Sequence, residues 1–157
     1  MSEAAFSEYG RWISADLRDA DADIPELKFW NRLGLMEHQG DTSVSIVRTY
    51  GKNGLIEETL ERHMKTGEAL LPTEDIIIVV ALPADSSGEK PNLDTVKAFP
   101  VKKGEAVILH EAVWHHAPLT EADTADTFVV FKSDTPENDF LALELKEEFD
   151  VYFEVVK

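Results

Sequence analysis

The sequence contains no cysteine among its 157 residues. This absence excludes disulfide bonds, thiolate nucleophiles, iron–sulfur clusters and zinc sites with cysteine ligands. A protein without disulfides suits a reducing compartment, so we expect it in the cytoplasm. The opening stretch, MSEAAFSEYGRW, is polar and acidic and has neither the basic start nor the apolar core of a secretory signal.

Long apolar runs are equally scarce. The longest, IIIVVAL at 76–82, is far shorter than the roughly 18 residues that a membrane-spanning helix needs, so we expect no membrane segment. A chain of 157 residues with 43% hydrophobic residues has the length and composition of one globular unit. No linker or repeat divides it, and the sequence therefore predicts a single domain over 1–157.

Basic residues are few. Fifteen lysines and arginines stand against 31 acidic residues, which gives a formal net charge of −16. A field of this sign repels phosphate backbones and anionic lipids, so we expect neither nucleic acid nor a membrane as a partner. Solubility is the simplest consequence of the charge. An anionic substrate would need a local cation or a metal ion to overcome it.

What the chain does contain is a series of short β-type segments. TSVSIVRTY at 42–50 alternates, and IIIVVAL reads as a strand buried on both faces. Turn sequences such as GKNGL at 51–55 recur about every ten residues, a spacing typical of a β-sandwich or barrel. The first 35 residues are irregular, and ENDFLALELKEEF at 137–149 fits a strand or a short helix.

Two polar clusters interrupt the apolar pattern. Glu61 and His63 point to the same side of a predicted strand, because side chains alternate along a strand. Glu68 follows after a turn. In HEAVWHH, a strand ends at His110 and a short turn presents His115. If strands 57–63 and 105–110 face each other across a barrel, these side chains converge.

The predicted cluster consists of Glu61, His63, Glu68 and His115. Two imidazoles and two carboxylates suit one divalent ion of iron, manganese, nickel or zinc, and the same residues are the candidate catalytic groups. No nucleotide cofactor is expected. The competing interpretation is that the acids are solvated and the histidines lie on the surface, because nearly a fifth of the chain is acidic.

The spacing resembles the paired motif of the cupin superfamily, HxH-x4-E followed by G-x5-P-x-G-x2-H. In the first half, Glu61 stands where a histidine is usual, and His63 and Glu68 follow at the usual distances. In the second half, Gly104 and His115 match. His110 and Ala112 replace the usual proline and glycine.

A closer resemblance is to the ureidoglycolate lyase family of cupin-like enzymes. The segments that carry it occur in the family's order: FSEYG at 6–10, SIVR at 45–48, LERH at 60–63, IVVA at 78–81, KAF at 97–99, AVWHH at 112–116 and DTFVVF at 126–131. The resemblance implies an all-β, cupin-type double-stranded β-helix (jelly-roll) barrel with a short helical or irregular N-terminal segment. It also implies a homodimer that releases urea and glyoxylate from ureidoglycolate in purine catabolism.

Two residues depart from this family pattern. Ala112 replaces the glycine before VWHH, which would alter the turn that presents His115. Glu111 stands where a basic or neutral residue is expected, and it opposes a carboxylate substrate unless it points away. Arg48 and Lys97 are the cations that could offset the field, and Arg48 is the stronger candidate because it lies mid-strand.

The implied lyase reaction needs a base for the substrate's hydroxyl and an acid for its leaving nitrogen. His63 or His115 could be the base, Glu61 or Glu68 the acid or the group that orients the base, and a bound metal a Lewis acid. Arg48 would clamp the carboxylate in bidentate fashion. The complete set of candidate substrate-binding residues is Arg48, Lys97, His110, Trp114 and His116.

Two other functions remain open at this point. The barrel could be a metal-dependent isomerase or lyase for a sugar or sugar acid, which Ala112 and Glu111 make plausible by allowing a neutral substrate. It could instead bind a small polar molecule without turning it over. Trp114 could be a core or lid residue, and His116, on an extended chain, would point away from His115.

Overall fold

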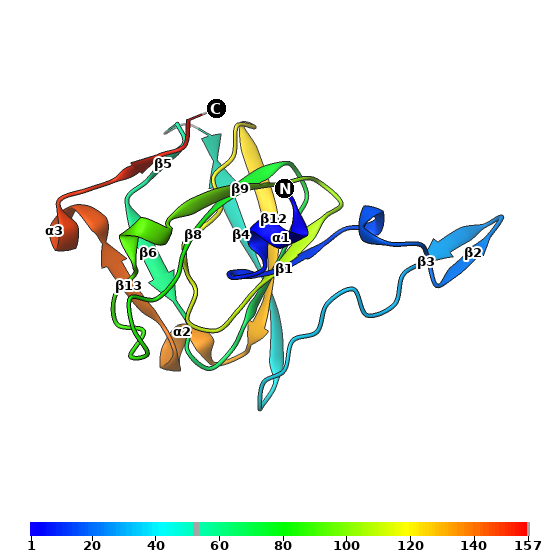
Figure 1. Ribbon diagram of the computed structural model, residues 1–157, viewed down its shortest axis with the longest axis horizontal. Coiled ribbons are helices and arrows are strands. Elements are labelled where there is room, and N and C mark those ends of the chain that lie inside the picture. Colours follow the sequence, from blue (N-terminus) through cyan, green and yellow to red (C-terminus); the bar gives the residue numbers. More distant parts are fainter. Residues whose placement is uncertain (52–53, 157) are drawn as a thin grey trace.

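Two five-stranded antiparallel sheets make up the body of the protein. The computed structural model describes residues 1–51 and 54–156 (Figure 1). The first sheet has the order β1 (Gly10–Ile13), β10 (Ala106–Leu109), β7 (Glu68–Pro72), β12 (Thr124–Lys132), β4 (Thr42–Tyr50). The second has the order β13 (Leu141–Glu144), β6 (Thr59–Arg62), β11 (Trp114–His115), β8 (Ile76–Ala81), β9 (Lys97–Val101).

The remaining elements are short. They are α1 (Glu3–Phe6), η1 (Ala15–Leu17), β2 (Ala22–Ile24), β3 (Leu27–Phe29), β5 (Ile56–Glu57), η3 (Leu93–Thr95), α2 (Thr135–Asn138), α3 (Leu145–Phe149) and β14 (Phe153–Glu154). The segment 137–149 thus contains both a strand and a helix. The predicted turn at 51–55 includes residues 52–53, which lie outside the described residues. No helix in the described part of the chain is long and apolar enough to cross a membrane.

Alternation along the strands explains how the sheets pack. In β12, Ala125, Thr127, Val129 and Phe131 are buried, whereas the residues between them face outward. Strand β8 is buried on both faces, as its apolar sequence predicts, because it lies between the barrel interior and a second core. The expected all-β jelly-roll of the cupin type, with its short N-terminal helix, is confirmed.

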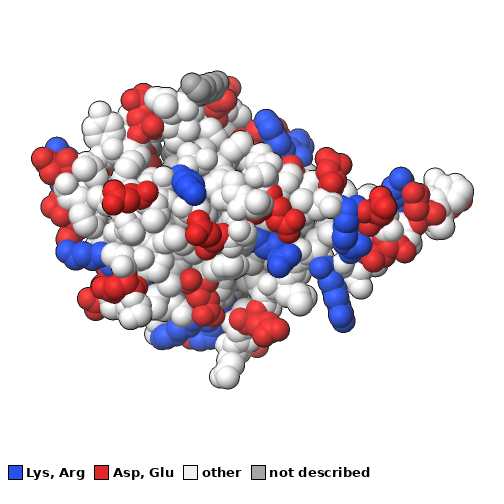
Figure 2. All heavy atoms as spheres, in the orientation of Figure 1, with Lys and Arg blue, Asp and Glu red and all other residues white. Residues whose placement is uncertain are grey.

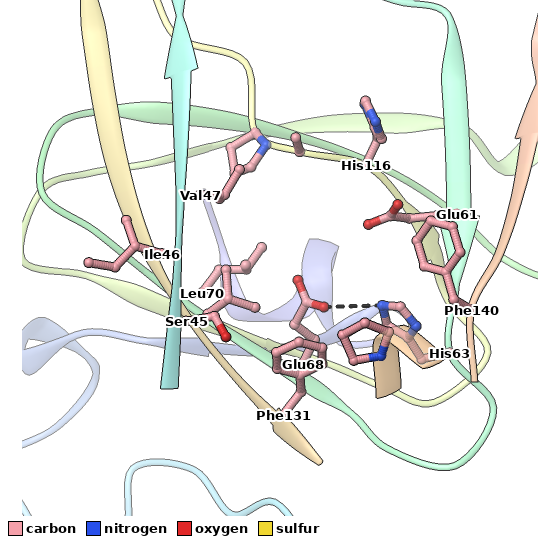
Figure 3. A pocket seen from close by; sticks show the side chains of 14 residues that line it. Ser45, Ile46, Val47, Glu61, His63, Glu68, Leu70, His116, Phe131 and Phe140 are labelled. Atoms are coloured by element: carbon pink, nitrogen blue, oxygen red, sulfur yellow. Dashed lines mark ion pairs between the residues drawn. The ribbon is translucent and has the colours of Figure 1, made fainter. Parts of the chain in front are cut away.

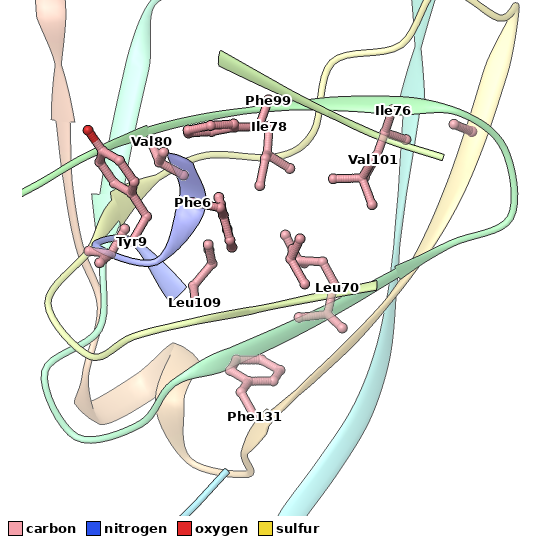
Figure 4. Packing of buried hydrophobic residues seen from close by; sticks show 14 residues of the cluster. Phe6, Tyr9, Leu70, Ile76, Ile78, Val80, Phe99, Val101, Leu109 and Phe131 are labelled. Atoms are coloured by element: carbon pink, nitrogen blue, oxygen red, sulfur yellow. The ribbon is translucent and has the colours of Figure 1, made fainter. Parts of the chain in front are cut away.

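The main core fills the space between the sheets (Figure 4). Phe6 of α1 is fully buried there and meets Phe99 of β9 edge to face, with ring centroids 5.1 Å apart. Toward β4 and α2 this core gives way to a cavity, since Leu70, Val129 and Phe131 belong to both. The fold therefore leaves an opening at one end of an otherwise packed barrel.

Candidate active site

Three of the predicted ligands converge from the second sheet. Glu61 of β6 and His115 of β11 are directly paired neighbours, so their side chains point to the same side. His63 follows the end of β6. The ligand atoms of these three residues all lie within 4.8 Å of one another, an arrangement that could hold a metal ion.

His115 reaches this cluster by a route that the sequence did not predict. It was expected on a turn, but it lies on β11, which pairs with β6 in the same sheet. After β10 in the opposite sheet, the chain crosses over at Ala112, whose φ is 65°. The Ala112 amide donates to the His63 carbonyl at 2.7 Å and so fastens the crossing to the end of β6.

Glu68 joins the cluster from β7 in the facing sheet. Its Oε2 lies 3.3 Å from His63 Nε2 and 3.5 Å from His115 Nε2, and all three side chains are buried. Figure 3 shows Glu61, His63 and Glu68 around one cavity. The four residues that the sequence singled out are therefore brought together.

The backbone orients both imidazole rings. His63 Nδ1 lies 2.8 Å from the Asp139 carbonyl, and His115 Nδ1 lies 2.9 Å from the Val113 carbonyl. A carbonyl can only accept, so each Nδ1 carries hydrogen and each Nε2 is directed toward Glu68. Nε2 of His115 is buried and has no hydrogen-bond partner among the described residues. An unpaired buried nitrogen of this kind, with two carboxylates nearby, fits a divalent metal ion.

Charge interactions set the protonation of the metal-free cluster. Burial by itself would raise the pKa of Glu68, but attraction to His115 and hydrogen bonds to both histidines outweigh it and lower this pKa to about 2. Burial would likewise lower the pKa of His115, but the charge and hydrogen bond of Glu68 raise it to about 9. At neutral pH, Glu68 is therefore anionic and His115 cationic in the absence of metal.

We expect the metal-free protein to lose stability as pH rises from 6.5 to 9. The raised pKa of His115, about 9 against 6.5 unfolded, stabilises the fold fully below 6.5 and ceases to do so through 9. The lowered pKa of Glu68 contributes above 4.5 and is lost toward 2. Melting curves of chelated protein should show a loss of about 3 kcal/mol over the alkaline interval. Glu68→Gln should flatten this dependence, and an unchanged slope in that variant would contradict the assignment.

The cavity beside the cluster has a volume of about 230 Å³. Its walls are mainly apolar, with polar groups from the cluster, Ser45 and His116. No lysine or arginine is among its described lining residues, which are Ser45, Ile46, Val47, Glu61, His63, Glu68, Leu70, His116, Ala117, Pro118, Val129, Phe131, Pro136 and Phe140.

His116 is the basic residue at this cavity. Its Nδ1 lies 3.1 Å from Oε1 of Glu57, a carboxylate that is only 3% exposed. The hydrogen bond to Glu57 raises the pKa of His116 against the opposing effect of burial. The sequence gave no signal for Glu57, which is one acid among many in an acidic stretch.

Arg48 and Lys97 do not reach the cavity. Arg48 was expected to clamp a carboxylate, but it lies on the exposed outer face of β4 and forms a bidentate pair with Asp126 at 2.6 and 2.8 Å. The alternation of β4 turns Ser45 and Val47 toward the cavity instead. Lys97 is exposed, and its Nζ lies 5.4 Å from the ring of Tyr9.

His110 and Trp114 also lie outside the cavity. His110 is exposed at the end of β10, and its amide bonds to the Tyr9 carbonyl. Trp114 was expected as a substrate contact or as core, and it is core. Its exposure is 0%, within a second cluster formed with Leu60, Ala81 and Leu145.

The acidic character of the surface is diffuse. On the face shown in Figure 2, acidic side chains are spread among basic ones and do not form a single patch. Glu111 is exposed and does not line the cavity. The carboxylate that was expected to oppose an anionic substrate therefore points away from the site.

Comparison with known proteins assigns the chain to a family. A family model described as ureidoglycolate lyase matches residues 1–152. The chain belongs to the ureidoglycolate lyase family. The ureidoglycolate lyases of Escherichia coli O1:K1 and Shigella boydii serotype 18 are each 35% identical to it over 122 residues, covering 74% of this chain and 74% of theirs. The oxalate decarboxylase of Lactobacillus farciminis superposes with a TM-score of 0.48 and 16% identity, over 71% of this chain and 32% of that one.

The departure at Ala112 is explained within the ureidoglycolate lyase family pattern. The family's glycine is suited to a left-handed turn, and Ala112 adopts that conformation with φ 65°. A side chain in this region costs roughly 1–2 kcal/mol. The crossing that delivers His115 to β11 is therefore kept, at some expense in stability.

Proposed function

We propose that this protein is a ureidoglycolate lyase. The family match over residues 1–152 supports the reaction, and the buried Glu61–His63–His115 cluster beside a cavity supports its location. In this reaction the C–N bond between the carbinol carbon and urea breaks. The hydroxyl oxygen becomes the carbonyl of glyoxylate, its proton goes to a base, and the leaving nitrogen gains a proton. We further propose that residues 1–157 act as a single domain.

We propose that Glu61, His63 and His115 hold one divalent metal ion, with Glu68 as a fourth ligand or as the proton acceptor. The unpaired Nε2 of His115 supports this, as does the mixed imidazole–carboxylate donor set. A metal ion here would polarise the substrate's oxygens as a Lewis acid. The lowered pKa of Glu68 makes it a carboxylate at neutral pH, so it fits an acceptor or ligand rather than the acid.

Product stoichiometry tests the reaction. The protein incubated with ureidoglycolate should release urea and glyoxylate in equal amounts, faster than the spontaneous reaction and without ammonia. Ammonia in place of urea would indicate hydrolysis of the ureido amide and would contradict the lyase assignment. No turnover above the spontaneous rate would contradict it as well.

We expect His116→Gln to raise KM about 10- to 100-fold with a smaller effect on kcat. His116 is the basic residue at a cavity without lysine or arginine among its described lining residues, and its raised pKa favours a cation that binds the substrate's carboxylate. A hydrogen bond to a charged group contributes about 1.5–3 kcal/mol. Steady-state kinetics measure the split. In the unmodified protein KM should rise with pH as His116 loses its proton, and an equal rise in the variant would rule the role out.

We also propose that the protein is a homodimer that buries the outer face of the first sheet. Ile46, Phe128 and Leu71 lie side by side on β4, β12 and β7, and they are 58%, 41% and 42% exposed. The hairpin β2–β3, which projects from the body in Figure 1, exposes further apolar side chains. Such surface is typical of an interface. Phe128→Glu should yield monomers by light scattering, whereas Val156→Glu, at an exposed C-terminal position, should not.

We place the protein in the cytoplasm, in the breakdown of purine-derived ureidoglycolate. The absence of cysteine is compatible with a reducing compartment, and the family's substrate is a small polar metabolite. Cell fractionation tests the location, and secretion of the protein would contradict it.

One observation favours a second candidate function. The described cavity lining is largely apolar and has no lysine or arginine, which suits a neutral substrate such as a sugar better than an anion. A metal-dependent isomerase or lyase for sugars would fit this lining. Turnover of a keto sugar without turnover of ureidoglycolate would decide for it.

A further inference from the structure

Asp139 connects a candidate metal ligand to the wall of the cavity. It follows α2 and is 7% exposed, although it carries a carboxylate. Its amide donates to the Thr135 carbonyl at 3.0 Å, which closes the short helix. A buried carboxylate is costly unless its oxygens are paired, so its partners indicate what it does.

The Asp139 side chain grips the turn that follows β6. Its Oδ1 accepts from the Met64 amide at 2.8 Å, and its Oδ2 accepts from the Lys65 amide at 2.6 Å. These two amides come directly after His63 in the chain. Both carboxylate oxygens are thus used to fix the backbone on one side of the ligand.

The Asp139 main chain holds the ligand itself. Its carbonyl accepts from Nδ1–H of His63 at 2.8 Å, which directs Nε2 of His63 toward Glu68. The next residue, Phe140, lines the cavity, and its ring centroid lies 6.1 Å from that of His63. One residue therefore sets the tautomer of His63, the direction of its ring and the position of an aromatic wall.

We propose that Asp139 is a positioning residue for the metal ligand His63, an inference that rests on the metal site of the proposed function. The carboxylate holds the turn and the α2 loop together, and this grip keeps the Asp139 carbonyl on Nδ1. Without the carboxylate the carbonyl moves off the ring and Nε2 loses its fixed direction. Partners of this kind typically change metal affinity about 10- to 100-fold.

Titration with Mn²⁺ tests the proposal independently of turnover. Asp139→Ala should weaken Mn²⁺ binding about 10- to 100-fold, and Asp139→Asn, which keeps one acceptor oxygen, should fall between this variant and the unmodified protein. The control is Glu137→Gln, which removes an exposed carboxylate from the same loop and should leave affinity unchanged. Circular dichroism at the titration temperature confirms that each variant is folded.

A folded Asp139→Ala protein with unchanged Mn²⁺ affinity would overturn the proposal. The unmodified protein offers a second measurement that does not depend on folding of the variants. Nitrogen NMR of metal-loaded protein should show hydrogen on Nδ1 of His63, and hydrogen on Nε2 would equally overturn it. Failure of the unmodified protein to bind Mn²⁺ would refute the inference as well, whereas lyase turnover by that metal-free protein would leave the proposed reaction standing.

Discussion

Replacement of His115 by alanine should abolish ureidoglycolate turnover while leaving the protein folded. His115 contributes one of the three ligand atoms that lie within 4.8 Å of one another. Loss of an outer partner of a metal site already reduces affinity or activity about 10- to 100-fold, so loss of a ligand should exceed about 100-fold. The measurement is initial-rate kinetics together with Mn²⁺ titration.

His110→Ala provides the matched control. His110 lies only five positions before His115 in the chain, but it is exposed and outside the cavity. Its replacement should leave both turnover and Mn²⁺ binding near those of the unmodified protein. Full activity in His115→Ala, or equal losses in both variants, would remove His115 from the site.

Trp114→Ala should lower the free energy of unfolding by about 3–5 kcal/mol. Trp114 is 0% exposed and packs with Leu60, Ala81 and Leu145 on the side of the second sheet covered by α3. Its removal leaves a cavity that this part of the barrel cannot fill. Chemical denaturation measures the loss, and Trp114→Phe, which retains most of the buried ring surface, should lose much less.

Kinetics of Trp114→Phe separate packing from substrate contact. Because Trp114 lies in the second core and does not line the cavity, KM for ureidoglycolate should stay unchanged in this variant. A large rise in KM with an unchanged free energy of unfolding would restore Trp114 as a substrate-binding residue.

The metal cluster was predictable because its geometry is mostly local. Glu61 and His63 share a face by the two-residue period of a strand, and Glu68 follows after one turn. The motif spacing then added His115. What the sequence could not provide was the crossing at Ala112 that places His115 beside Glu61. That crossing depends on a single left-handed residue.

Arg48 shows how the same periodicity can mislead. Val44, Ile46 and Arg48 share a face of β4, and their apolar members suggested the interior. The structure turns this face outward, with Val44 68% exposed. Alternation defines two faces but not which one is buried. Where the outer face is apolar, as an interface would be, the pattern favours the wrong side.

Asp139 and Glu57 could not be found from sequence. Asp139 contacts His63 across 76 positions of the chain, and no local pattern encodes such a contact. Glu57 is buried, but in sequence it looks like its exposed neighbour Glu58. Residues that orient the site depend on the packing of distant segments, which periodicity does not report.

The central claim is that the buried cluster works as a metal centre of a lyase. Ureidoglycolate turnover should therefore be measured as purified, after complete chelation, and after one equivalent of Mn²⁺ is returned. The account predicts that glyoxylate release falls to the spontaneous rate on chelation and recovers with the metal. Undiminished release by protein shown by elemental analysis to be metal-free would contradict it.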